Sequence, residues 1–81
     1  MDVVRTKLRE FIRGSFLVDE FQDGDSFLAT GLIDSLGMMQ LVSFVESEFK
    51  ISVKDTDLVP ENFDSVANIA AFVAREQARA A

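Results

Sequence analysis

Hydrophobic residues recur at helical spacing near the N-terminus of the chain. They form one apolar face at positions i, i+4, i+7 and i+8, made of Val4, Leu8, Phe11 and Ile12. Charged residues stand between them, which is typical of an amphipathic helix. Gly14 directly follows Arg13, and a glycine after a basic last turn often ends a helix. The pattern therefore predicts a first helix that stops at Gly14.

The strongest helical pattern covers about residues 35 to 50. Its predicted core stripe consists of Met38, Leu41, Val42, Val45 and Phe49. At about 100° per residue, the opposite face collects Leu36, Met39, Gln40, Ser43 and Ser47. Phe44 falls at the flank of the stripe. Two apolar residues, Leu36 and Met39, are thus expected to face solvent.

The hydrophobic residues between Ser15 and Asp34 follow no regular helical or strand period, so we expect a long loop there. Its apolar residues are expected to pin it across the helices: Phe16, Leu17, Phe21, Phe27, Leu28 and Leu32. Asp23-Gly24-Asp25 lacks the alternating ligands and distal Glu of a calcium-binding EF-hand loop. We therefore predict no metal site.

The C-terminal part alternates short turns with one more helix. Ile51-Ser52-Val53 has no partner strand and is expected to be an extended connection, followed by short helical turns near Asp55 and at Pro60–Phe63. The last predicted helix follows Asp64-Ser65, and its apolar face is Val66, Ile69, Ala70 and Val73 with Phe72 alongside. Residues 76–81 are expected to fray. The result is a single domain, 1–81, folded as a small all-α bundle.

Composition narrows the possible chemistry. The 81 residues include no Cys and no His, and the net charge is −6. Such acidity disfavours nucleic-acid binding and favours basic partner surfaces, although it also serves solubility. No apolar run reaches the roughly 18 residues that span a bilayer, and no signal-peptide layout is present. We expect a cytoplasmic monomer that does not insert into membranes.

Two Asp-Ser pairs precede predicted helices, Asp34-Ser35 and Asp64-Ser65. Both residue types are favoured helix N-caps, so a structural role is the ordinary interpretation of each pair. Ser35 differs because it follows a glycine-containing turn and precedes the outward-facing Leu36 and Met39. The free N–H groups and dipole of the following helix would also favour a phosphate there. Ser35 is therefore the candidate attachment point.

The stretch Gly31-Leu32-Ile33-Asp34-Ser35-Leu36 resembles the modification motif of acyl carrier proteins. In that family the serine of Asp-Ser-Leu receives 4′-phosphopantetheine from coenzyme A. The resemblance extends to the acidity, the amphipathic first helix, the long loop, Glu46-Ser47-Glu48-Phe49 and Phe63-Asp64-Ser65-Val66. It implies a four-helix bundle with a long loop between helices 1 and 2 and a short third helix.

The resemblance also implies roles for individual residues. Ser35 would be the attachment residue, and Asp34 would support the approach of the modifying enzyme. The partner-binding face would consist of Leu36, Met39, Gln40, Ser43, Glu46 and Ser47, with Glu48 nearby. The implied partners are a phosphopantetheinyl transferase, an adenylate-forming ligase or acyltransferase, and other acyl-processing enzymes.

Two positions depart from the pattern of fatty-acid carriers, which usually have acids just after the motif. This chain has Gly37 and Gln40 there, and it lacks the Gly-Gly-x-Ser style motif of peptidyl carriers. Ser35-Leu36-Gly37 and the region Val59–Phe63 look more like stand-alone carriers served by adenylate-forming ligases, such as D-alanyl carriers.

Two other functions compete with a carrier. One is an unmodified helical interaction module, in which Leu36, Met39 and Phe44 simply dock a partner. The other is an enzyme, but without His or Cys a catalyst would need a carboxylate pair or a Ser–Lys arrangement. No spacing in the chain indicates either arrangement, so we expect a carrier without catalytic residues.

Overall fold

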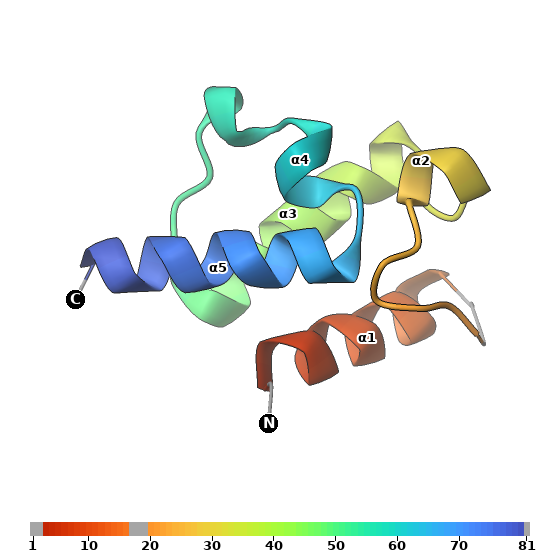
Figure 1. Ribbon diagram of the computed structural model, residues 1–81, viewed down its shortest axis with the longest axis horizontal. Coiled ribbons are helices and arrows are strands. Elements are labelled where there is room, and N and C mark those ends of the chain that lie inside the picture. The colour runs from red at the N-terminus through yellow and green to blue at the C-terminus, as the bar shows by residue number, and fades with distance from the viewer. Residues whose placement is uncertain (1–2, 17–19, 81) are drawn as a thin grey trace.

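A computed structural model describes residues 3–16 and 20–80 and shows an all-α chain (Figure 1). The predicted anchor Leu17 lies outside these ranges. Within them the elements are α1 (Val3–Phe16), α2 (Phe27–Thr30), α3 (Ser35–Phe49), the 3₁₀ turn η1 (Asp55–Asp57), α4 (Pro60–Phe63) and α5 (Val66–Ala80). The described ranges contain no strand. The prediction of a small helical bundle is confirmed.

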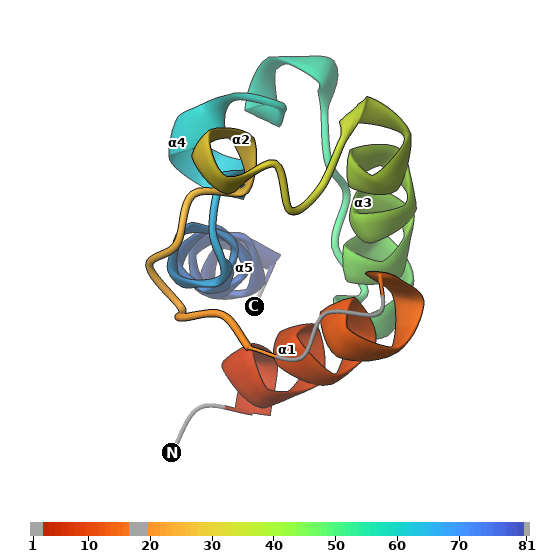
Figure 2. The same cartoon turned by 90° about the vertical axis from the view of Figure 1, so that its right-hand side faces the viewer.

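The three long helices surround one hydrophobic core. α5 packs against α1 and α4, and α1 also packs against α3. Figure 2 shows α1, α3 and α5 around the centre, with the short helices α2 and α4 together at one end. The fully buried side chains of the core include Leu8, Ile12, Phe27, Leu41, Val45, Val66, Ile69, Phe72 and Val73. These residues come from the predicted apolar faces, apart from Phe27 in the predicted loop.

The predicted end of the first helix at Gly14 is wrong, because α1 continues to Phe16. The extra turn brings Phe16 onto the core, where its ring makes an edge contact with Phe11 at a centroid distance of 6.2 Å. A glycine inside a helix costs only about 1 kcal/mol relative to alanine. Packing of the Phe16 ring offsets a cost of that size, so Gly14 does not end the helix.

The predicted long loop contains a helical turn, α2, that the sequence pattern did not predict. Ser26 caps this turn by accepting a hydrogen bond from the Ala29 N–H at 3.0 Å. Gly31 ends it with a φ of +70°, a backbone conformation that glycine adopts at little cost. One turn is too short to show a hydrophobic period, and its four residues are Phe27, Leu28, Ala29 and Thr30.

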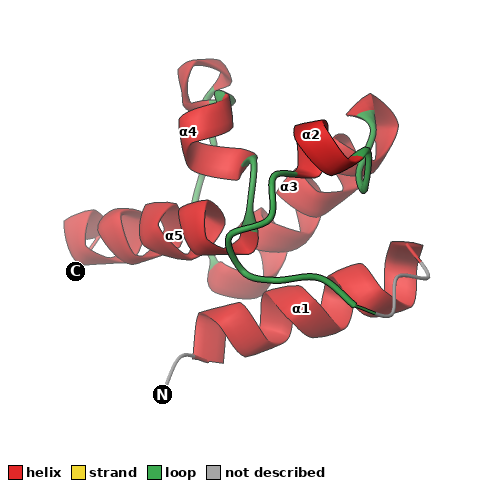
Figure 3. Cartoon of the chain, turned by 45° about the vertical axis from the view of Figure 1, so that its right-hand side comes forward, coloured by secondary structure: helices red, strands yellow, loops and turns green. Residues whose placement is uncertain are grey.

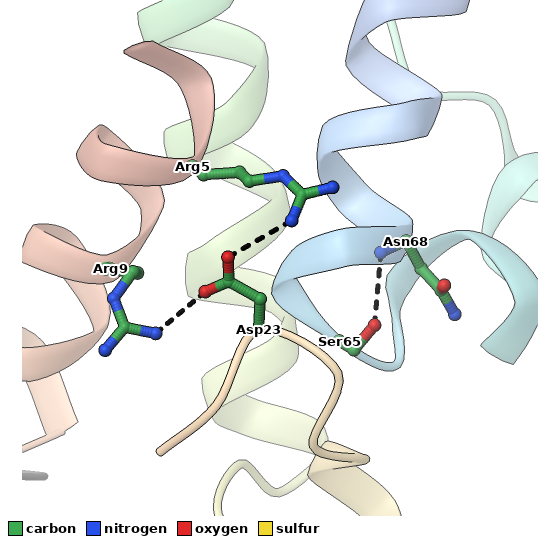
Figure 4. Close-up of polar contacts among 5 residues, drawn as sticks. All are labelled: Arg5, Arg9, Asp23, Ser65 and Asn68. Carbon is green, nitrogen blue, oxygen red and sulfur yellow. Dashed lines mark hydrogen bonds and ion pairs between the residues drawn. The ribbon is translucent and has the colours of Figure 1, made fainter. Parts of the chain in front are cut away.

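The part of the connection before α2 is held at Asp23. The Asp23 carboxylate pairs with Arg5 at 3.2 Å and with Arg9 at 2.8 Å, and both arginines lie on α1 (Figure 4). The Asp23 carbonyl accepts a hydrogen bond from the Ala67 N–H of α5 at 2.8 Å. Figure 3 shows this segment running along α1 and past the start of α5 to α2. Of the predicted apolar anchors, Phe21 and Phe27 are buried, but the prediction is wrong for Leu28, which is 65% exposed.

The C-terminal predictions are largely confirmed. Ile51–Val53 is an extended connection, and η1 and α4 occupy the two predicted turns. Met38 is an exception within the α3 stripe, because it is only half-buried at the edge of the core. α5 is helical through Ala80, and fraying of its end in solution stays a prediction. Within the described ranges, the helices fall short of the length and hydrophobicity needed to cross a bilayer.

Candidate functional site

The site is built on the first turn of α3, where Asp34 is the N-cap. Asp34 has an extended backbone, and its Oδ1 accepts a hydrogen bond from the Gly37 N–H at 2.8 Å. Its carbonyl oxygen accepts the Met38 N–H at 2.8 Å. The side chain of Asp34 thus satisfies one of the donors that a helix start would otherwise leave to solvent, and its carbonyl accepts the first bond of the helix. The capping role that the Asp-Ser pattern allowed for either residue belongs to Asp34.

Ser35 therefore does not serve as the cap of α3. It is the first residue of α3, it is exposed, and its hydroxyl makes no hydrogen bond with the residues that the structure describes. Ser65 in the second Asp-Ser pair is different, with only 5% of its surface exposed. Its Oγ accepts the Asn68 N–H at 3.1 Å and caps α5 (Figure 4). The two serines, similar in sequence, therefore have opposite environments.

The outward face of α3 is exposed as predicted. Leu36 and Met39 retain 74% and 57% of their exposure, which is high for large apolar side chains. The polar members of the face, Gln40, Ser43 and Ser47, are exposed too. Phe44 lies at the flank, half-buried, and its ring stacks on Phe11 at a centroid distance of 4.1 Å.

The two glutamates of α3 are engaged within the chain. Glu46 is half-buried, and its carboxylate accepts the Val53 N–H at 2.9 Å, which fixes the extended connection against α3. Glu48 pairs with Lys7 of α1 at 2.7 Å. Sequence reasoning grouped Glu46 with the partner-binding residues, but the structure gives its carboxylate a role in holding the fold. Sequence reasoning did not predict the ion pair of Glu48 with Lys7.

A shallow apolar groove of about 270 Å³ begins beside Asp34 and Ser35. Its walls are Leu28 from α2, Ile33, Met38 and Met39, and Leu58 after η1. A second groove, of about 170 Å³, shares Leu28, Met38 and Leu58 and continues to Val59, Pro60 and Phe63. Sequence reasoning missed Leu28 and Leu58 as site residues, because both lie in stretches without a helical period.

The chemistry available at this site is that of a single hydroxyl beside an apolar groove. No cluster of potential metal ligands occurs among the described residues. The first N–H groups of α3 that Asp34 does not satisfy lie next to Ser35, and helix starts favour phosphate there. A phosphodiester-linked arm fits this combination of an exposed, unused hydroxyl, a helix start and an adjoining apolar groove.

Comparison with known families agrees with this geometry. The family model described as a phosphopantetheine attachment site matches residues 4–73, which run from the second residue of α1 to the middle of α5. No curated protein matches the chain significantly. The family match extends over most of the sequence, well beyond the motif around Ser35. The chain therefore belongs to the phosphopantetheine-attachment family, whose carrier domains hold a covalent 4′-phosphopantetheine group.

Proposed function

We propose that this protein is a carrier that holds an acyl or aminoacyl group as a thioester on a 4′-phosphopantetheine arm at Ser35. The observation that carries the proposal is the difference in role between Asp34 and Ser35 at the start of α3. Asp34 caps α3, which leaves the exposed Ser35 hydroxyl without a hydrogen-bond partner among the described residues. If the hydroxyl of a serine caps a helix, as that of Ser65 does, esterification of that hydroxyl would disturb the cap.

The arm supplies a terminal thiol, which the chain itself lacks because it contains no cysteine. The residues around Ser35 hold and present that arm. The start of α3 stabilises the phosphodiester through its N–H groups and dipole, without a basic side chain. Tethering keeps the cargo at a high effective concentration near successive enzymes. The protein itself contributes no catalytic residue to this scheme.

The partners we propose are a phosphopantetheinyl transferase, an adenylate-forming ligase or acyltransferase, and further acyl-processing enzymes. They would dock around Ser35 on Leu36, Met39, Gln40, Ser43 and Ser47. Gly37 and Gln40 support a stand-alone carrier served by an adenylate-forming ligase, of the D-alanyl type, over a fatty-acid carrier. We propose that the carrier acts as a monomer in the cytoplasm, since a net charge of −6 opposes self-association.

The decisive experiment is enzymatic loading followed by intact-mass measurement. The protein is incubated with coenzyme A, magnesium and a phosphopantetheinyl transferase of broad tolerance. We expect one phosphopantetheine addition in the wild type and in Ser65→Ala, and none in Ser35→Ala. Circular dichroism of both variants verifies folding. Failure of the wild type to gain mass, under conditions that load a control carrier, would refute the proposal.

The exposed Leu36 and Met39 also suit an unmodified interaction module, which is the second candidate function. The Ser35→Ala variant separates the two candidate functions. A module that needs no arm would bind its partner equally well with Ser35→Ala, whereas a carrier would lose cargo transfer completely.

A further inference from the structure

The exposed face of α3 next to Ser35 carries no charge. We define the uncharged face as Leu36, Met39, Gln40, Ser43 and Ser47. No ionisable residue occurs in the sequence from Ser35 to Val45, although the whole chain has a net charge of −6. Asp34 at the start of α3 is exposed, but its Oδ1 accepts the Gly37 N–H. Apart from Asp34, an enzyme that approaches Ser35 along the exposed face of α3 meets neutral groups first.

The acids that follow on α3 do not restore a negative patch. Glu46 is half-buried and accepts the Val53 N–H at 2.9 Å, so its carboxylate is turned to its own backbone. Glu48 lies 2.7 Å from the Lys7 ammonium, which neutralises it locally. Both carboxylates of α3 are thus occupied within the chain.

Exposed apolar side chains gather at the same end of the molecule. The described residues include six large exposed hydrophobic side chains, and five of them lie on α2, at the start of α3 or after η1. These five are Leu28, Leu36, Met39, Leu58 and Val59. Leu28, Met39 and Leu58 line the groove that begins at Ser35, and Val59 lines its continuation. Scattered exposed hydrophobic residues are ordinary, but a concentration around a candidate site indicates contact with a partner.

We propose, on the basis of the proposed carrier function, that the enzymes acting at Ser35 recognise this protein through an apolar, uncharged contact surface. Their matching surface would present hydrophobic side chains and neutral hydrogen-bonding groups, without a cluster of Lys or Arg. Any enzyme that reaches the Ser35 hydroxyl must cover the first turns of α3. A charge buried against such a neutral surface is destabilising, and a partner without a basic cluster gains no specific ion pair from the acids of the chain.

Charge insertion of both signs tests the proposal. The phosphopantetheinyl transferase of the same organism is used as the probe, and kcat/KM for loading is measured with Gln40→Glu and Gln40→Lys. A neutral partner surface predicts that both variants lose about fivefold or more, equivalent to about 1 kcal/mol. The matched controls are Gln77→Glu and Gln77→Lys on the exposed surface of α5, which are expected to stay within about twofold of the wild type.

Two further measurements complete the test. Glu48→Gln removes the charge and keeps one acceptor oxygen for the Lys7 ammonium, so it is expected to load normally. Raising the salt concentration from about 0.05 to 0.5 M shortens the range of electrostatic attraction strongly and is expected to change kcat/KM less than about twofold.

A basic partner surface would give a different pattern. Loading would improve with Gln40→Glu, fall with Gln40→Lys and with Glu48→Gln, and decline steeply with salt. That pattern would overturn the inference while leaving Ser35 as the attachment residue. Absence of loading in the wild type would instead refute the carrier function itself.

Discussion

Gly37 in the first turn of α3 packs closely against the ring of Phe16 from the end of α1. A methyl group placed on Gly37 would come within 2.7 Å of Phe16 Cε1, closer than real side-chain contacts allow. The same methyl would lie 3.1 Å from Ile33 Cγ2 and 3.2 Å from Asp34 Oδ1. Because Gly37 has no side chain, the end of α1 packs closely against the turn that carries Ser35. The glycine that departs from the fatty-acid carrier pattern therefore has a packing function.

Gly37→Ala is accordingly expected to destabilise the protein by about 1–2 kcal/mol despite the better helix propensity of alanine. The Phe16 ring must move, and its edge contact with Phe11 is disturbed. Urea unfolding monitored by circular dichroism measures the effect. Gly14→Ala is the matched control, because nothing lies within 4 Å of a methyl group there. It is expected to stabilise α1 by about 0.5–1 kcal/mol. Equal stabilisation by both substitutions would contradict the packing role of Gly37.

The same contact explains where sequence reasoning about the fold succeeded and where it failed. The apolar faces of α1, α3 and α5 follow the helical period and were predictable, because each long helix has one side to bury. The end of α1 was mispredicted because Gly14 is locally a stop signal. The packing of Phe16 against Phe11 and against Gly37, which lies far along the sequence, makes a further turn favourable. Such long-range packing leaves no local pattern.

The two Asp-Ser pairs predict contrasting effects on stability. Ser65→Ala removes a buried helix cap and is expected to cost about 1 kcal/mol or more. Asp34→Ala is expected to cost about 1 kcal/mol for the same reason. Ser35→Ala is expected to change stability by less than about 0.5 kcal/mol, since its hydroxyl is exposed and makes no hydrogen bond within the described part of the chain. Thermal unfolding of the three variants provides the comparison, and a large loss in Ser35→Ala would assign a structural role to that serine.

Asp64 is expected to control the local stability of α2 more than that of the whole fold. Its Oδ1 accepts the Leu28 N–H at 2.9 Å, its other oxygen accepts the Ser26 hydroxyl, and its carbonyl accepts the Phe27 N–H at 2.7 Å. Asp64→Ala removes the two side-chain bonds. We expect amide hydrogen exchange of residues 27–31 to accelerate at least about tenfold relative to the core of α5, because local opening then costs at least about 1.4 kcal/mol less.

Asp57→Ala is the control for this measurement, because the Asp57 carboxylate accepts only a local bond from the Lys54 N–H in η1. It is expected to leave exchange in α2 unchanged. Uniform acceleration across the whole chain in Asp64→Ala would show that α2 is not an independent opening unit.

The candidate site was predictable only in part. The exposure of Leu36 and Met39 follows from the periodicity of α3, which fixes the direction of each side chain. The contributions of Leu28 and Leu58 depend on how α2 and η1 fold over the start of α3, which no short sequence pattern encodes. The engagement of Glu46 depends likewise on the path of residues 51–53. Sequence reasoning located the serine, and the surroundings required the three-dimensional structure.

Asp23 gives the fold a stabilising contribution that depends on pH. Partial burial of its carboxyl opposes ionisation, but hydrogen bonds and attraction from Arg9 and Arg5 outweigh burial, and the pKa of Asp23 lies below its usual value. A carboxyl whose pKa is lower in the folded than in the unfolded state stabilises the fold at neutral pH. That contribution is complete above the unfolded pKa of about 3.9 and is lost as the pH falls through the folded value.

Asp23→Asn is therefore expected to be less stable than the wild type by about 1 kcal/mol at pH 7, a modest loss because solvent screens these half-exposed pairs. The difference is expected to hold down to about pH 5 and to shrink below about pH 4, where protonation of Asp23 removes the same ion pairs from the wild type. Urea unfolding of both proteins across this range measures the difference directly, and other carboxylates cancel because both proteins contain them. Glu20→Gln, a nearby exposed acid, controls for the loss of one negative charge. A difference that stayed constant below about pH 4 would mean that the substitution weakens the fold through packing, and that the ion pairs of Asp23 with Arg5 and Arg9 contribute nothing.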